Sequence, residues 1–167
     1  MSFVPGSDAP RPSGPGVKLT YDDFVHFPDD GKRWACLKGH PVGEIFGAPF
    51  DVVFSDFDVV EPDLLFVSSD RSQVLTEKNV QGAPDLVVEI GAPATRRRDE
   101  KTKLQLYERF GVQEYWVVDP DLDVIKVYRL VEGRYQRTAE LTLADHHVLS
   151  TPLIPGLELS LADIFPE

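Results

Sequence analysis

The sequence contains a single cysteine, Cys36, so no disulfide bond can form within the chain. Chains without internal disulfides are typical of reducing compartments, which favours a cytoplasmic protein. The sequence also lacks any apolar run approaching the roughly 20 residues that a membrane-spanning helix requires. Its first residues have no continuous apolar stretch of the kind found in signal peptides. These absences exclude a disulfide-stabilised secreted domain and predict a protein with no membrane partner.

Basic residues are scarce as well, with 17 lysines and arginines against 28 acidic residues and a formal net charge of -11. Proteins that hold nucleic acid through its phosphates are usually basic on at least one face. The charge therefore argues against a protein that coats nucleic acid. It is compatible with a local basic strip beside a metal site, because carboxylate ligands themselves add negative charge.

The composition divides the chain into a short tail and one domain. Residues 1–16 carry four prolines and three glycines and few apolar side chains, which predicts a disordered tail. The remaining residues, 17–167, predict a single domain, since domains typically hold about 100–200 residues. With 42% hydrophobic residues the chain has enough apolar side chains for a substantial core.

Periodicity and turn residues predict the helices and strands. Short helices are expected at residues 21–27, before Pro28, and at 99–110, before Gly111. Phe-Asp-Val-Val occurs twice, which predicts a hairpin of residues 50–54 and 57–61. The second strand of this hairpin is expected to continue to about Val67, with a bend, a bulge or a sheet edge at Pro62. Further elements are expected as strands at 86–90 and 115–118, a hairpin at 124–130 and 135–141, and a last helical turn at 161–165. This order predicts an α/β fold with a mixed sheet.

Two of the expected strands carry acidic residues within apolar stretches. Asp63 shares a strand face with Leu65, and Glu89 shares one with Val87, because side chains alternate along a strand. If the two strands are neighbours with these faces aligned, Asp63 and Glu89 meet at one point. Paired carboxylates on strands are suited to hold Mg²⁺, which requires oxygen ligands and can activate water against a phosphoryl group.

A second interpretation of these residues involves no catalysis. A glutamate at a strand end that faces a helix lysine is often only a buried ion pair, and such pairs also cluster charges. Lys101 and Lys103, in the helix that follows Glu89, are the lysines available to it. Asp63 could equally be a turn or bulge residue after Pro62. Spacing alone leaves the two interpretations open.

Three stretches, "FDVVFSDFDVVEPDLLFVSSDR", "GAPDLVVEIGAPATRRRDEKTKLQLYERFGVQEYWVVDPD" and "PLIPGLELSLADIF", resemble the Uma-type family of restriction endonuclease-like proteins. That family belongs to the PD-(D/E)xK nuclease superfamily. The resemblance implies a restriction-endonuclease-like mixed sheet flanked by helices. It also implies a Mg²⁺-dependent endonuclease, with Mn²⁺ as an alternative cofactor, that hydrolyses phosphodiester bonds of nucleic acid, most often DNA.

The resemblance assigns roles to individual residues. Asp63, in "PDL", and Glu89, in "VVE", correspond to the metal ligands of the family. The run Arg96–Arg97–Arg98, close to the site in the sequence, is expected to hold the phosphate backbone. A solvated loop and helix start is the alternative interpretation of this basic run, because short basic stretches are weak motifs.

The catalytic lysine is expected in an unusual place. The position two residues after Glu89, where the superfamily has its lysine, is Gly91. The resemblance implies that this family takes the lysine from the following helix instead, where it lies within a pattern like "RRD..xKL..Y". Aligning Leu104 and Tyr107 with that pattern puts Lys103 in the lysine position, with Lys101 as the alternative.

The sequence departs from the family between Arg33 and Gly43. Residues 34–41, "WACLKGHP", stand where the resemblance leads us to expect roughly forty more residues, about a hairpin and a long helix. The N-terminal part of the domain is therefore expected to be truncated. This supports a second hypothesis, a catalytically inactive nuclease-like protein that binds nucleic acid, a protein partner or a second copy as a homodimer through the uncovered sheet.

Overall fold

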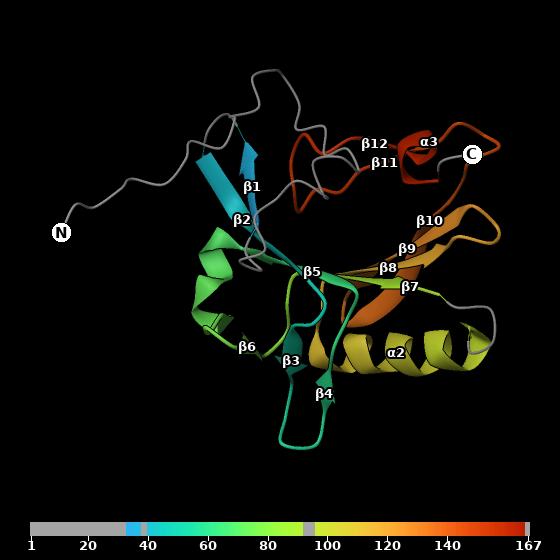
Figure 1. Ribbon diagram of the computed structural model, residues 1–167. Coiled ribbons are helices and arrows are strands. Elements are labelled where there is room, and N and C mark those ends of the chain that lie inside the picture. Colours follow the sequence, from blue (N-terminus) through green and yellow to red (C-terminus); the bar gives the residue numbers. More distant parts are fainter. Residues whose placement is uncertain (1–32, 38–39, 92–95, 166–167) are drawn as a thin grey trace.

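The protein is described by a computed structural model covering residues 33–37, 40–91 and 96–165. Within these ranges the chain forms a seven-stranded sheet with strand order β1-β2-β5-β7-β8-β9-β10 (Figure 1). Strands β7 and β8 are parallel and the other neighbours are antiparallel, so the predicted mixed sheet is confirmed. The strands are β1 (Arg33–Leu37), β2 (His40–Gly47), β5 (Leu64–Ser68), β7 (Leu86–Ile90), β8 (Glu114–Asp119), β9 (Val124–Val131) and β10 (Arg134–Thr142).

A smaller three-stranded sheet lies beside the main one, in the order β4-β3-β6. It consists of β3 (Asp51–Val53), β4 (Val59–Val60) and β6 (Asn79–Gln81), and the 3₁₀ helix η1 (Ser69–Val74) lies between β5 and β6 in the chain. Val52 pairs with Val60, which confirms the first hairpin. The predicted continuation to Val67 is interrupted, because β4 ends before Pro62 and β5 begins after it in the other sheet. Proline lacks the amide that a strand ladder needs, so it marks the change of sheet.

Helix α2 (Arg96–Phe110) covers one face of the main sheet (Figure 1). It connects the parallel strands β7 and β8, as a crossover helix must. Leu104 and Tyr107 on its inner side belong to one apolar cluster with Val87 and Tyr115 of the sheet. The helix begins three residues before the predicted start and ends where predicted, with Gly111 at φ +80 as its cap.

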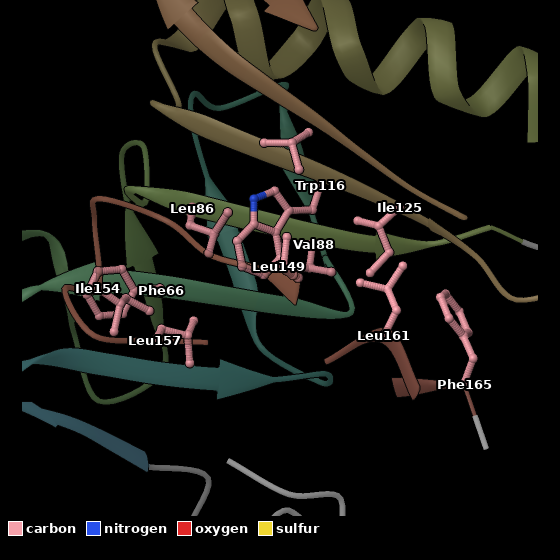
Figure 2. Packing of buried hydrophobic residues seen from close by; sticks show 11 residues of the cluster. Phe66, Leu86, Val88, Trp116, Ile125, Leu149, Ile154, Leu157, Leu161 and Phe165 are labelled. Carbon is pink, nitrogen blue, oxygen red and sulfur yellow. The ribbon is translucent and has the colours of Figure 1, made fainter. Parts of the chain in front are cut away.

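The opposite face of the sheet is covered by the C-terminal part of the chain. This part contains the two-stranded sheet β11 (Val148–Leu149) and β12 (Leu159–Ser160) and the short helix α3 (Leu161–Ile164). Figure 2 shows its apolar side chains against the sheet. The cluster contains Phe66, Leu86, Val88, Trp116, Ile125, Val127, Leu149, Ile154, Leu157, Leu161 and Phe165. Strand β7, buried on both faces up to Glu89, is thus the centre of the fold.

The N-terminal part of the described chain is the hairpin of β1 and β2, with pairing from Arg33–Ile45 to Leu37–His40. Within the described residues, this hairpin lies at the edge of the main sheet. The predicted tail at residues 1–16 and helix at 21–27 lie outside the described residues. Among the helices that are described, none is long and apolar enough to cross a membrane.

Candidate active site

The strand pairing brings Asp63 and Glu89 together. β5 and β7 are antiparallel, with Leu64 opposite Val88, so one further step along this register places Asp63 opposite Glu89. The Asp63 Oδ2 atom accepts a hydrogen bond from the backbone N–H of Ile90 at 2.7 Å. The two predicted acids are therefore neighbours, as the alignment of strand faces required. Their role as metal ligands stays a prediction.

Helix α2 presents two donors to the Glu89 carboxylate. Lys103 Nζ donates to Glu89 Oε2 at 2.7 Å, and the Tyr107 hydroxyl donates to Oε1 at 2.6 Å. The two donors are one helical turn apart, so they project from the same side of α2. Lys101 is exposed and, two residues away, projects from nearly the opposite side. Of the two lysines considered from the sequence, Lys103 is the one beside Glu89.

Burial controls the electrostatics of this carboxylate. Glu89 is 6% exposed, and burial raises its pKa above the ordinary value of 4.5. The hydrogen bonds from Lys103 and Tyr107 act against this rise, while the negative charge of Asp63 adds to the raised pKa. Burial and the neighbouring Glu89 also raise the pKa of Tyr107 above 10, so its hydroxyl remains a proton donor at working pH. A cation between the two acids would offset their repulsion.

The raised pKa of Glu89 predicts how stability depends on pH. A carboxyl whose pKa is higher in the folded state stabilises the protein below its unfolded value and loses that contribution as pH rises through the folded value. Metal-free Glu89→Gln has no such group. We therefore expect its free energy of unfolding, relative to wild type, to increase as pH rises from about 4.5 and then to level off. Urea unfolding of both proteins at a series of pH values measures this difference in free energy. A difference that does not change with pH would contradict a raised pKa of Glu89.

Asp63 has a structural role that does not account for its charge. Its bond to the Ile90 amide continues the ladder at the point where β5 begins. An asparagine could accept the same bond without placing a second negative charge beside Glu89. The charge of Asp63 is unfavourable to Glu89 in the metal-free protein, and such costs are concentrated at functional sites.

Glu114 of β8 shows what a purely structural buried glutamate looks like in this fold. It is 1% exposed and accepts from Trp116 Nε1 at 2.6 Å, Arg129 Nε at 2.9 Å and Thr151 Oγ1 at 3.1 Å. Both of its oxygens have side-chain donors, as those of Glu89 do, and Arg129 is as exposed as Lys103, at 36% against 37%. Glu89 differs in having a second carboxylate, that of Asp63, beside it.

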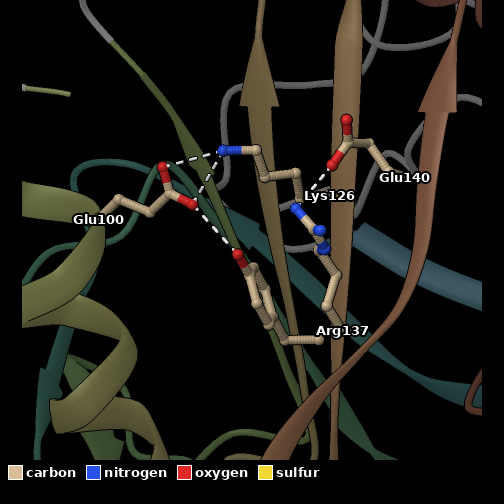
Figure 3. A network of polar contacts seen from close by, with 5 residues as sticks. Glu100, Lys126, Arg137 and Glu140 are labelled. Atoms are coloured by element: carbon tan, nitrogen blue, oxygen red, sulfur yellow. Dashed lines mark hydrogen bonds and ion pairs between the residues drawn. The ribbon is translucent and has the colours of Figure 1, made fainter. Parts of the chain in front are cut away.

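A polar network fixes the first turns of α2 to the sheet (Figure 3). Glu100 accepts from Lys126 Nζ at 3.1 and 3.2 Å and from the Tyr128 hydroxyl at 3.1 Å, both on β9. Arg137 and Glu140 form a further ion pair of 2.7 Å on β10. The sequence analysis missed this network, although the alternation in β9 put Lys126 and Tyr128 on one face. The network holds the helix that carries Lys103.

The described residues supply two carboxylates rather than a larger cluster. No group of three or more His, Cys, Asp or Glu that could hold a metal ion is found within them. Glu61, on the same chain segment as Asp63, is exposed. Two oxygen donors suit a hard divalent cation such as Mg²⁺, which commonly keeps several waters and binds only one or two protein carboxylates. The residues present thus fit such a cation.

Tyr107 is the site residue that sequence analysis did not identify. Tyr107 was used only as a matching position of the family pattern, four residues after Lys103, and was given no role of its own. The partner of its hydroxyl could not be read from that pattern, because the contact depends on where β7 lies under α2. Arg96, Arg97 and Arg98 open α2, and their contact with phosphate stays a prediction.

Comparison with known proteins agrees with the resemblance seen in the sequence. The model of the Uma2 family, "Putative restriction endonuclease", matches residues 30–162. No curated protein shows significant similarity to the chain. The crystal structure of "a putative nuclease belonging to DUF820 from Anabaena variabilis" is 18% identical with a TM-score of 0.60, covering 89% of this chain and 98% of that chain. At this identity the likeness shows a shared fold.

Proposed function

The chain belongs to the Uma2 family of putative restriction endonucleases, and from this premise we propose that it is a divalent-metal-dependent endonuclease acting on DNA. One observation carries the proposal beyond family membership. Asp63, which immediately precedes β5, lies beside Glu89 at the end of β7, and a lysine of the following helix contacts Glu89 at 2.7 Å. Groups of this kind can support metal-dependent hydrolysis of a phosphodiester bond.

Asp63 and Glu89 would hold the cation, Mg²⁺ or Mn²⁺. When bound, the metal supplies a Lewis acid that polarises a phosphoryl oxygen and lowers the pKa of a bound water. Lys103 would orient the attacking water and neutralise negative charge developing on the phosphate. Its side chain is 37% exposed, so Lys103 is partly accessible from solvent while in contact with Glu89.

The substrate would be held by its phosphates. Arg96, Arg97 and Arg98 begin the helix whose later turns carry Lys103, which puts three basic residues in the chain segment next to the site. Phosphate contacts position nucleic acid without reading its sequence. The net charge of -11 limits nucleic-acid binding to such a local region. Because this binding would depend on phosphate contacts, it should weaken as the salt concentration rises.

Metal binding provides a first test of the proposed function. A cation that binds only the folded protein stabilises it, by about 2.7 kcal/mol at a hundred times its Kd. We expect millimolar Mg²⁺ or Mn²⁺ to raise the Tm of the wild type and to leave that of Glu89→Gln unchanged. Cleavage of plasmid and single-stranded DNA under the same conditions then tests catalysis. A Tm insensitive to both metals, with no cleavage, would refute the proposal.

An open strand edge favours one alternative function. Among the described residues β1 is the outermost strand of the main sheet, and an unpaired edge can pair with another chain. The alternative is a non-catalytic nuclease-like protein that binds a partner, or a second copy as a homodimer, through the edge of the sheet at β1. A folded protein that binds no metal, and whose mass in solution is that of a dimer, would support it.

A further inference from the structure

Tyr107 is the least exposed of the groups that contact Glu89. Its side chain is 0% exposed, and its hydroxyl donates to Glu89 Oε1 at 2.6 Å. Such a short bond to a carboxylate is a charge-assisted hydrogen bond, which is stronger than one between neutral groups. Tyr107 therefore fixes the Glu89 carboxylate through a strong hydrogen bond, in addition to the packing of its ring.

The ring of Tyr107 is fixed by its aromatic neighbours. The Phe54 ring lies edge-on to it with centroids 6.1 Å apart, and the Tyr115 ring is tilted against it at 5.0 Å. The hydroxyl of a ring fixed in this way has little freedom to choose another acceptor. Lys103, by contrast, has a flexible four-carbon stem and is 37% exposed. The two donors thus hold Glu89 with different rigidity.

The difference suggests a division of roles between the donors. If Lys103 alone held Glu89, movement of its ammonium group toward substrate would release the carboxylate as well. A rigid second donor keeps Glu89 in place while Lys103 moves. Outer hydrogen-bond partners of metal ligands act in this way, fixing the orientation of the ligand and raising metal affinity.

The geometry points to Tyr107 as a positioning residue of the active site, whose hydroxyl holds the Glu89 carboxylate beside Asp63 and leaves Lys103 free for water and phosphate. This inference rests on the proposed function. It separates two residues of one helix, since Lys103 would touch the substrate and Tyr107, being buried, would not. Loss of the Tyr107 hydroxyl should then affect metal affinity and leave DNA binding unchanged.

Tyr107→Phe tests the role, because it removes one oxygen atom and keeps the ring. Tyr135→Phe is the matched control, since Tyr135 belongs to the same cluster and its hydroxyl donates to the backbone carbonyl of Val112 at 2.8 Å, away from Glu89. We expect Mn²⁺ affinity, measured by calorimetry, to fall about 10- to 100-fold in Tyr107→Phe and to be unchanged in Tyr135→Phe. The KM for DNA should be unchanged in both, and excess metal should restore the kcat of Tyr107→Phe.

Affinities are measured below the melting temperatures of all three proteins, so that unfolding does not change the measured Mn²⁺ affinity. If the wild type binds Mn²⁺ and Tyr107→Phe binds it equally well, Tyr107 is only structural and the inference is wrong, while the proposed function stands. Equal losses of affinity in the two variants would also overturn it, by showing a general effect on the cluster. If the wild type itself binds no Mn²⁺, the proposed function fails and the inference fails with it.

Discussion

Glu89→Gln is expected to lower metal-dependent cleavage of DNA by at least about 100-fold, since even partners behind a metal ligand are worth 10- to 100-fold. The substitution keeps the size of the side chain and one oxygen, but removes the negative charge that a cation needs. The expected measurement is kcat/KM on plasmid DNA with Mg²⁺ and with Mn²⁺. The fold should survive, because an amide at this buried position costs less to desolvate than the carboxylate it replaces.

The matched control for this variant is Glu114→Gln. Glu114 is also a buried strand glutamate, but its oxygens contact Trp116, Arg129 and Thr151. Its substitution should lower the Tm, because the Arg129 pair is weakened, and leave the activity of the folded protein close to wild type. Cleavage retained in Glu89→Gln would remove Glu89 from the mechanism. Equal loss in both variants would show that any buried charge change is harmful.

Lys103→Met is expected to lower kcat by about 10²- to 10³-fold, the usual loss when one group that stabilises developing negative charge is removed. Methionine keeps most of the aliphatic stem, so packing on α2 changes little. Metal should still bind, because Asp63 and Glu89 remain, and a bound cation offsets the charge that Lys103 leaves unpaired. Single-turnover cleavage at saturating metal measures the effect on chemistry.

Lys101→Met is the control for the lysine assignment. It makes the same chemical change two residues earlier on α2, at an exposed position that projects away from Glu89. The activity of Lys101→Met should be close to that of the wild type. A large loss in Lys101→Met with little loss in Lys103→Met would reverse the assignment of the two lysines.

Local patterns predicted the central elements of the fold well. β7 was expected at residues 86–90 and is found there, because a short apolar run between turn residues has few other conformations in a folded chain. The hairpin of β9 and β10 was expected around Glu132–Gly133, and both residues have positive φ there. Alternation of side chains also predicted that Asp63 and Glu89 could face one spot, provided their strands were neighbours.

Other features depend on contacts between distant parts of the chain, and these left no local pattern. Tyr107 matched the family pattern, but the pattern did not reveal its contact with Glu89, because tertiary packing sets the position of Glu89 beneath the helix. β6 pairs in parallel with β3, although β4, β5 and η1 lie between them in the chain. No turn residues in the sequence predict this pairing. Pro62 was recognised as a break, but which sheet each side of it joins is decided by packing.

The cover that the C-terminal part forms over the sheet has a consequence for synthesis in the cell. Asp63, Glu89 and Lys103 have all been translated when the ribosome reaches residue 103, yet the apolar face of the sheet behind them is closed by residues 149–165. Contacts of such long sequence separation form late, and domains generally fold as units. A nascent chain that stalls before residue 149 would expose Phe66, Val88 and Trp116 to chaperones and proteases. The residues of the proposed site are thus expected to reach their final arrangement only after residues 149–165 have left the ribosome.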